Sequence, residues 1–129
     1  MIKIEHIAIW VHDLEKMKAF YTHWFQFHSN DKYVNSKKGF SSYFLSSGDG
    51  NSRIESMTRD NDLYSLLATD TYGWAHKALS LGSKEQVDVL TEKMVAEGIL
   101  GVGEARWTGD GYYESVIEDP DGNKIELTI

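Results

Sequence analysis

The sequence predicts an α+β protein built from two tandem βαβββ modules. The same order of strand-like and helix-like segments occurs twice, each helix-like segment has apolar residues at helical spacing, and each copy ends in strands joined by a turn rich in Gly, Asp and Asn. A chain of 129 residues has the length of one domain. We assign module one to about residues 1–58, a connection to about 59–73, and module two to about 74–129.

The first copy opens with a strand and a helix. Glu5–Val11 is rich in β-branched and aromatic residues, as strands are. Asp13 is a candidate N-cap, and apolar residues at helical spacing extend the helix to about Phe25. Further strands and one short helix within the connection follow. The strands are expected at Lys32–Val34, Gly39–Ser46 and Arg53–Thr58, and the turn Ser47–Asn51 joins the last two. The short helix is expected at Leu63–Ala68.

The second copy repeats this order. Trp74–Leu81 is expected to be a strand, and Ser83 with Gln86 three residues later forms a capping-box pattern at the start of a helix. Gly98 is well placed to end that helix. The remaining strands are expected at Val102–Trp107, Tyr112–Glu118 and Asn123–Ile129, the last two forming a hairpin around Asp119–Gly122.

Composition excludes several classes of protein. With 13 basic and 20 acidic residues the net charge is −7, which disfavours binding to nucleic-acid phosphates. There is no cysteine, which excludes disulfides, a thiolate nucleophile and a cysteine zinc site. No apolar run approaches the roughly 20 residues of a membrane helix, and the first residues lack a signal pattern. We therefore expect a cytoplasmic protein that acts on a small molecule, without nucleic-acid or membrane partners.

Four residues occupy matching places in the two copies. His6 and His76 lie in the first strand of each copy, and Glu55 and Glu126 lie in the last strand of each. Because side chains alternate along a strand, the apolar neighbours of these residues point to the opposite face. We therefore expect each sheet to pack its apolar face under a helix and to leave the His and Glu face open.

Two imidazoles and two carboxylates suit a divalent metal ion, namely Ni, Zn, Co, Mn or Fe. A single His or Glu in a strand is usually only the solvated side of a sheet, and for one residue alone the ligand interpretation has odds of roughly one in ten. Chance placement of all four in register is much less probable. Lys77 breaks the apolar pattern, and we expect its ammonium to reach water near the strand end.

Several segments together carry a resemblance to a known family. They are Ile4–Ile9 with Asp13–Glu15 and Phe20–Tyr21, then Arg53–Glu55, Ala75–His76 and Asp119–Leu127. In these the chain resembles the vicinal oxygen chelate superfamily, which includes glyoxalase I, extradiol dioxygenases, methylmalonyl-CoA epimerase, and the fosfomycin and bleomycin resistance proteins. The resemblance covers residues 1–129 as a single domain. It implies half-barrel sheets with helices on the outer face, a metal enclosed by two modules, and a homodimer.

By this resemblance His6, Glu55, His76 and Glu126 are the metal ligands, and Glu55 and Glu126 are also the catalytic carboxylates. The His/Glu/His/Glu pattern is similar to glyoxalase I. It implies a carbon–sulfur lyase like lactoylglutathione lyase, acting on an adduct of a 2-oxoaldehyde and a thiol. Glu126 would take the proton from the carbon beside the carbonyl, and a carboxylate would return it to the neighbouring carbon.

One position departs from the family pattern. Glutathione-dependent members have an arginine four residues after the first ligand His, whereas this chain has Trp10, which suits a more apolar or planar ligand. Arg53, Arg59 or Lys124 could supply the missing positive charge. We expect Trp10, Arg53, Met57 and Lys124 to line the substrate cleft. Two alternatives stay open, namely a non-catalytic drug- or metabolite-binding protein of the resistance type and a ring-opening dioxygenase.

Overall fold

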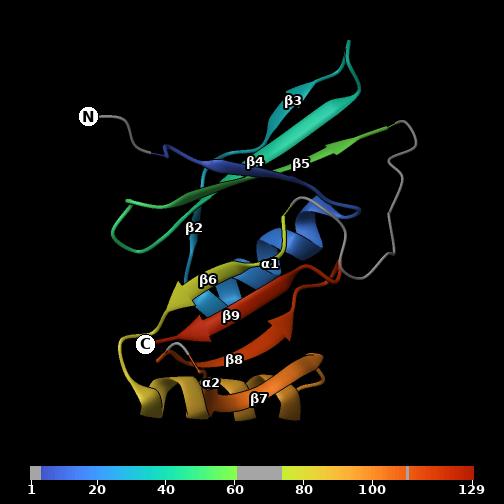
Figure 1. Ribbon diagram of the computed structural model, residues 1–129. Coiled ribbons are helices and arrows are strands. Elements are labelled where there is room, and N and C mark those ends of the chain that lie inside the picture. Colours follow the sequence, from blue (N-terminus) through green and yellow to red (C-terminus); the bar gives the residue numbers. More distant parts are fainter. Residues whose placement is uncertain (1–3, 61–73, 110) are drawn as a thin grey trace. The chain divides into compact units, whose positions relative to one another are not determined.

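A computed structural model describes residues 4–60, 74–109 and 111–129 (Figure 1). The chain divides into two compact units, Met1–Leu66 and Leu67–Ile129, and each contains one of the predicted repeats. The α+β class with two βαβββ modules is confirmed. The helix expected at Leu63–Ala68 lies outside the described residues.

The first unit builds a five-stranded sheet and one helix. Strand β5 lies between β1, which runs parallel to it, and β4, which runs antiparallel, while the short strands β2 and β3 both pair with β4. Strand β2 was not predicted, because two residues are too few to show a pattern. The elements are β1 (Ile7–Trp10), α1 (Leu14–Phe25), β2 (His28–Ser29), β3 (Tyr33–Asn35), β4 (Phe40–Ser46) and β5 (Arg53–Arg59).

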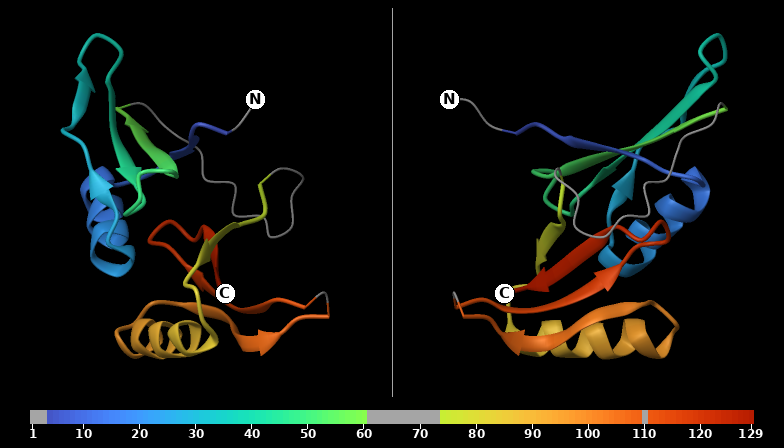
Figure 2. Two further views of the ribbon diagram at one scale, coloured as in Figure 1. Left: turned by 90° about the vertical axis from the view of Figure 1, so that its left-hand side faces the viewer. Right: turned by 45° about the vertical axis from the view of Figure 1, so that its right-hand side comes forward.

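The second unit repeats this plan with four strands in the order β6-β9-β8-β7. The first and last of its strands pair in parallel, as in the first unit. Figure 2 shows α2 lying along its sheet. The elements are β6 (Lys77–Ser80), α2 (Lys84–Ala96), β7 (Gly101–Trp107), β8 (Tyr113–Glu118) and β9 (Lys124–Thr128). Neither helix in the described part of the chain is long and apolar enough to cross a membrane.

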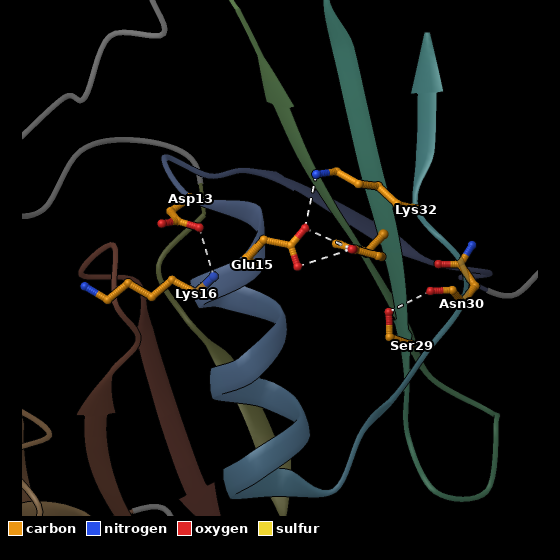
Figure 3. Close-up of polar contacts among 7 residues, drawn as sticks. Asp13, Glu15, Lys16, Ser29, Asn30 and Lys32 are labelled. Atoms are coloured by element: carbon orange, nitrogen blue, oxygen red, sulfur yellow. Dashed lines mark hydrogen bonds and ion pairs between the residues drawn. The ribbon is translucent and has the colours of Figure 1, made fainter.

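Local side-chain contacts fix where each helix begins. Asp13 Oδ1 accepts a hydrogen bond from the backbone N–H of Lys16 at 2.9 Å, as Figure 3 shows, and Ser83 Oγ accepts one from Gln86 at 3.3 Å. Each bond satisfies a donor that the first helical turn leaves without a partner. Gly98, at φ +90° just beyond the end of α2, confirms the predicted stop.

Each helix covers the apolar face of its own sheet. The side chains that carry this packing are fully or almost fully buried, and each contributes about 1.5–3 kcal/mol through removal of apolar surface from water. They include Met17, Tyr21 and Leu45 in the first unit and Val87, Met94, Ile117, Ile125 and Leu127 in the second. The predicted division into an apolar face under the helix and a more polar open face is therefore confirmed within each unit.

A polar contact ties the start of α1 to the sheet beside it. Glu15 accepts hydrogen bonds from Lys32 Nζ at 3.1 Å and from the hydroxyl of Tyr43 at 2.9 Å, and Figure 3 shows Glu15 reaching toward Lys32. These bonds, Lys32 first and Tyr43 second, hold the pKa of Glu15 below its usual value. The contact fixes α1 over β4, behind the face that carries the candidate site.

Candidate functional site

Each unit brings one imidazole and one carboxylate together on its open face. Strand pairing aligns Ala8 with Glu55 in the first unit and Ala78 with Glu126 in the second. In both units the His lies two residues before that alanine and therefore on the same side as the Glu. The predicted internal register is thus present in the backbone pairing of both sheets.

The two pairs have similar separations and similar exposure. His6 Nε2 lies 3.7 Å from Glu55 Oε2, and the side chains are 35% and 19% exposed. His76 Nε2 lies 3.1 Å from Glu126 Oε2, with side chains 44% and 19% exposed. Both carboxylates are therefore mostly shielded, while both imidazoles keep an open edge that a ligand in solution can reach.

The strands that carry the histidines are shorter than predicted. Strand β1 begins at Ile7 and β6 at Lys77, so His6 and His76 each stand directly before a strand rather than inside it. Ladder pairing begins with Ile7 opposite Ile54 and Lys77 opposite Ile125. Neither His has a ladder partner of its own, so contacts with neighbouring side chains orient it.

In the first unit, those contacts come from Glu5. Its carboxylate accepts a hydrogen bond from His6 Nδ1 and another from the Arg53 guanidinium, and these bonds keep the pKa of Glu5 below its usual value. The ring of His6 also meets the edge of Phe44 at 5.2 Å. The contact between Nδ1 and Glu5 orients the ring so that Nε2 faces Glu55. The sequence did not point to Glu5, since side chains alternate along a strand and Glu5 was therefore expected on the face opposite His6.

In the second unit, the residue after His76 forms a buried ion pair. Lys77 Nζ lies 3.6 Å from Asp119 Oδ2, and the two side chains are 13% and 0% exposed. The expectation that the Lys77 ammonium reaches water is therefore wrong, because the turn before β9 places a buried carboxylate beside it. Burial lowers the pKa of Lys77, and Asp119 opposes that shift. Asp119 also accepts hydrogen bonds from Asn123, which shape the turn leading to Glu126.

Of the four residues expected to line a substrate cleft, three lie in the first unit and one lies in the second. Trp10 and Met57 are paired across β1 and β5 on the open face of the first unit, and Trp10 is 42% exposed. Arg53 lies over the ring of Phe44 at 4.5 Å and is engaged by Glu5, so its charge is already compensated. Lys124 belongs to the second unit, on the same face of β9 as Glu126 and opposite Glu118.

The donor atoms of the two pairs, an imidazole nitrogen and a carboxylate oxygen in each, are of the types that bind divalent metal ions. Nitrogen and oxygen ligands that share one ion at about 2.0–2.2 Å lie roughly 3–3.5 Å apart. The 3.1 Å separation in the second unit lies within that range, and the 3.7 Å separation in the first is slightly longer. Within the described parts of the chain the candidate ligands occur as pairs, and no group of three or more His, Asp or Glu side chains arranged to hold a metal is found.

Comparison with known proteins places this arrangement in a family context. The family described as the Glyoxalase/Bleomycin resistance protein/Dioxygenase superfamily matches residues 3–127. A relative from Bacillus subtilis, the uncharacterized protein YqjT, is 43% identical over 58 residues. That match covers 43% of this chain and 45% of the relative, so it spans less than half of the relative's length.

Solved structures show the same fold. A glyoxylase/bleomycin resistance protein/dioxygenase domain from Frankia has a TM-score of 0.83 at 18% identity, covering 100% of this chain and 98% of that one. A glyoxalase I variant from Zea mays has a TM-score of 0.76 at 22% identity over 98% of this chain and 44% of its own. The fosfomycin resistance protein FosX from Listeria monocytogenes, complexed with Mn(II) and 1S,2S-dihydroxypropylphosphonic acid, has a TM-score of 0.72 at 25% identity, covering 99% and 90%.

Proposed function

Because the chain belongs to the Glyoxalase/Bleomycin resistance protein/Dioxygenase superfamily, we propose that it is a metal-dependent lyase or isomerase of the glyoxalase I type. The substrate would be a small molecule with a proton to be removed from a carbon beside a carbonyl, such as an adduct of a 2-oxoaldehyde and a thiol. The observation that carries the proposal is the His–Glu pair repeated in register in both sheets. A protein that only binds a ligand has no need of this repeated set.

We propose that His6, Glu55, His76 and Glu126 together hold one divalent ion. The two units of one chain, or of two chains in a homodimer, would supply the two pairs and so act as one functional domain. The ion, when bound, would supply a Lewis acid next to a substrate oxygen. The choice among Ni, Zn, Co, Mn and Fe follows from the mixed imidazole and carboxylate donors. The similarity to a FosX structure that contains Mn(II) supports a divalent ion here.

The carboxylates would move the proton. Glu126, 19% exposed and beside His76, takes the proton from the carbon that bears sulfur in the adduct. The electron pair of that C–H bond would form a C=C bond to the neighbouring carbon, whose carbonyl electron pair moves onto its oxygen. A carboxylate, Glu55 or Glu126, would then return the proton to the neighbouring carbon. The hydroxyl proton of the sulfur-bearing carbon would pass to the former carbonyl oxygen as the C=O bond of the thioester forms. The product is a thioester with the same atoms as the adduct. Low exposure limits competition by water for the same proton.

The remaining cleft residues would position the substrate. Trp10 and Met57 offer an apolar surface on the His6 face of the first sheet, and Lys124 offers a positive charge two residues before Glu126. Arg53 is compensated by Glu5, so its role here would be to hold Glu5 against His6 rather than to bind an acidic substrate. Trp10 stands where glutathione-dependent members have an arginine, and this favours a thiol other than glutathione.

The direct test is an assay of methylglyoxal with several thiols after loading with nickel, zinc, cobalt, manganese or iron, in which thioester formation is followed by absorbance. The account predicts turnover with at least one pairing. Glu126→Gln should lower kcat/KM by about 10²–10⁴-fold. The matched control is Glu114→Gln, which changes a carboxylate on the same face of the second sheet but outside the pair. Absence of turnover with every metal and thiol would overturn the proposal and leave two alternatives, a binding protein and a ring-opening dioxygenase.

A further inference from the structure

The open face of the first sheet carries an aromatic cluster at the end away from His6. Phe40 on β4 lies between Trp10 on β1, at 6.2 Å between ring centroids, and Tyr33 on β3, at 6.1 Å. The residues Trp10 and Tyr33 are 42% and 53% exposed. Single exposed aromatic residues are common on protein surfaces and need no explanation. A cluster of exposed aromatic residues, in contrast, is typical of ligand-binding surfaces.

A guanidinium completes this cluster. Arg59, at the end of β5, lies over the ring of Trp10 at 4.7 Å. A stacked guanidinium keeps its N–H donors in its own plane, where they can bind a carboxylate with two parallel hydrogen bonds. Arg53 on the same strand is engaged by Glu5, whereas no carboxylate among the described residues forms an ion pair with Arg59. Its positive charge is therefore available to a ligand.

Strand geometry connects this cluster to the candidate metal ligands. Trp10 follows His6 by four residues, and Arg59 follows Glu55 by four, so both lie on the same open face as the His–Glu pair. Four residues of strand span about 13 Å. In the described part of the second unit, Ser80 occupies the position on β6 that corresponds to Trp10.

We propose that Trp10, Phe40, Tyr33 and Arg59 form a subsite for a planar aromatic carboxylate. The ring of the ligand packs against Trp10 and Phe40, and its carboxylate accepts two hydrogen bonds from Arg59. The further statement that this ligand is the non-reacting end of the substrate rests on the proposed function. It describes the substrate as an elongated molecule of roughly 13 Å whose reacting carbon lies near Glu55 and whose aromatic acid lies near Arg59.

The subsite is tested on metal-free protein by isothermal titration calorimetry with three probes: 2-naphthoate, its neutral isostere 2-naphthamide, and the aliphatic anion hexanoate. We expect 2-naphthoate to bind at least about 10-fold more tightly than either other probe. Arg59→Gln should weaken 2-naphthoate by about 10-fold or more, and Trp10→Leu should weaken both naphthyl probes. Arg106→Gln, which removes an exposed guanidinium from β7 of the second unit, is the matched control and should change nothing.

Three results would overturn the subsite, provided that circular dichroism shows each variant folded: equal affinity for 2-naphthoate and 2-naphthamide, equal effects of Arg59→Gln and Arg106→Gln, or no detectable binding of 2-naphthoate. Metal-free conditions separate this test from the proposed function. Naphthoate binding with the expected variant pattern supports the subsite even if the thiol assay shows no turnover. Turnover without naphthoate binding would overturn the subsite and leave the proposed function standing.

Discussion

The buried ion pair between Lys77 and Asp119 allows a quantitative prediction about stability. Lys77→Met keeps an apolar stem of similar length but removes the ammonium that lies 3.6 Å from Asp119 Oδ2. The Asp119 side chain is 0% exposed, so its charge cannot regain water. Breaking a buried pair by removing one partner costs about 3–5 kcal/mol. Lys77 is 13% exposed and Asp119 keeps its bonds from Asn123, which places the expected loss near the lower end of that range.

Urea unfolding followed by circular dichroism measures this loss. A loss of about 3 kcal/mol should also lower Tm by roughly 10 °C in a chain of this length. Lys84→Met is the matched control, because Lys84 makes an exposed pair with Asp88 at 2.7 Å and its side chain is 46% exposed. That variant should lose less than about 1 kcal/mol. Equal stabilities of the Lys77→Met and Lys84→Met variants would show that the pair of Lys77 and Asp119 does not behave as a buried ion pair.

A double-mutant cycle isolates the interaction itself. Asp119→Asn combined with Lys77→Met should cost less than the sum of the single changes, by about 1–3 kcal/mol, because the double variant leaves no uncompensated buried charge. Strict additivity of the two changes would show that the two side chains do not interact.

Two further predictions concern contacts in the first unit. Glu5→Gln should weaken divalent-metal binding by about 10–100-fold in a competition titration with a chromophoric chelator, while the exposed control Glu15→Gln should not; similar effects of both would contradict a specific role for Glu5. Hydrogen bonds from Ser47 and Asn51 lower the pKa of Asp49 to about 2, from 3.8, so its stabilising contribution is complete above pH 3.8 and is lost as pH falls toward 2. The Tm difference between wild type and Asp49→Asn should therefore shrink over that range, and a constant difference would count against it.

Local patterns were enough to predict α1, α2 and most of the strands in the described part of the chain. The caps Asp13 and Ser83 act within their own first turns, so their roles follow from neighbouring residues alone. Strand starts were less predictable, since β1 and β6 begin only where a partner strand is available to pair. The expected strands at Glu5–Val11 and Trp74–Leu81 were accordingly too long.

The candidate site was predictable where the repeat placed equivalent residues in register. The pairing of Ala8 with Glu55 and of Ala78 with Glu126 follows from that duplication. Lys77 and Asp119 could not be matched in the same way, since a contact between a strand start and a distant turn leaves no local pattern. The aromatic cluster around Trp10 likewise depends on the strand order, which brings aromatic residues of β1, β4 and β3 together on one face of the sheet.

The number of metal ions bound per chain decides whether the two His–Glu pairs form one centre. Equilibrium dialysis against nickel, zinc, cobalt or manganese, with elemental analysis of the retained protein, should give one ion per chain for the metal that binds best. Replacing either imidazole or either acid, in the variants His6→Gln, Glu55→Gln, His76→Gln and Glu126→Gln, should weaken that single binding event. Two independent ions per chain would contradict a centre shared by both pairs. So would a metal affinity that falls in the variants of one unit but is unchanged in the variants of the other unit.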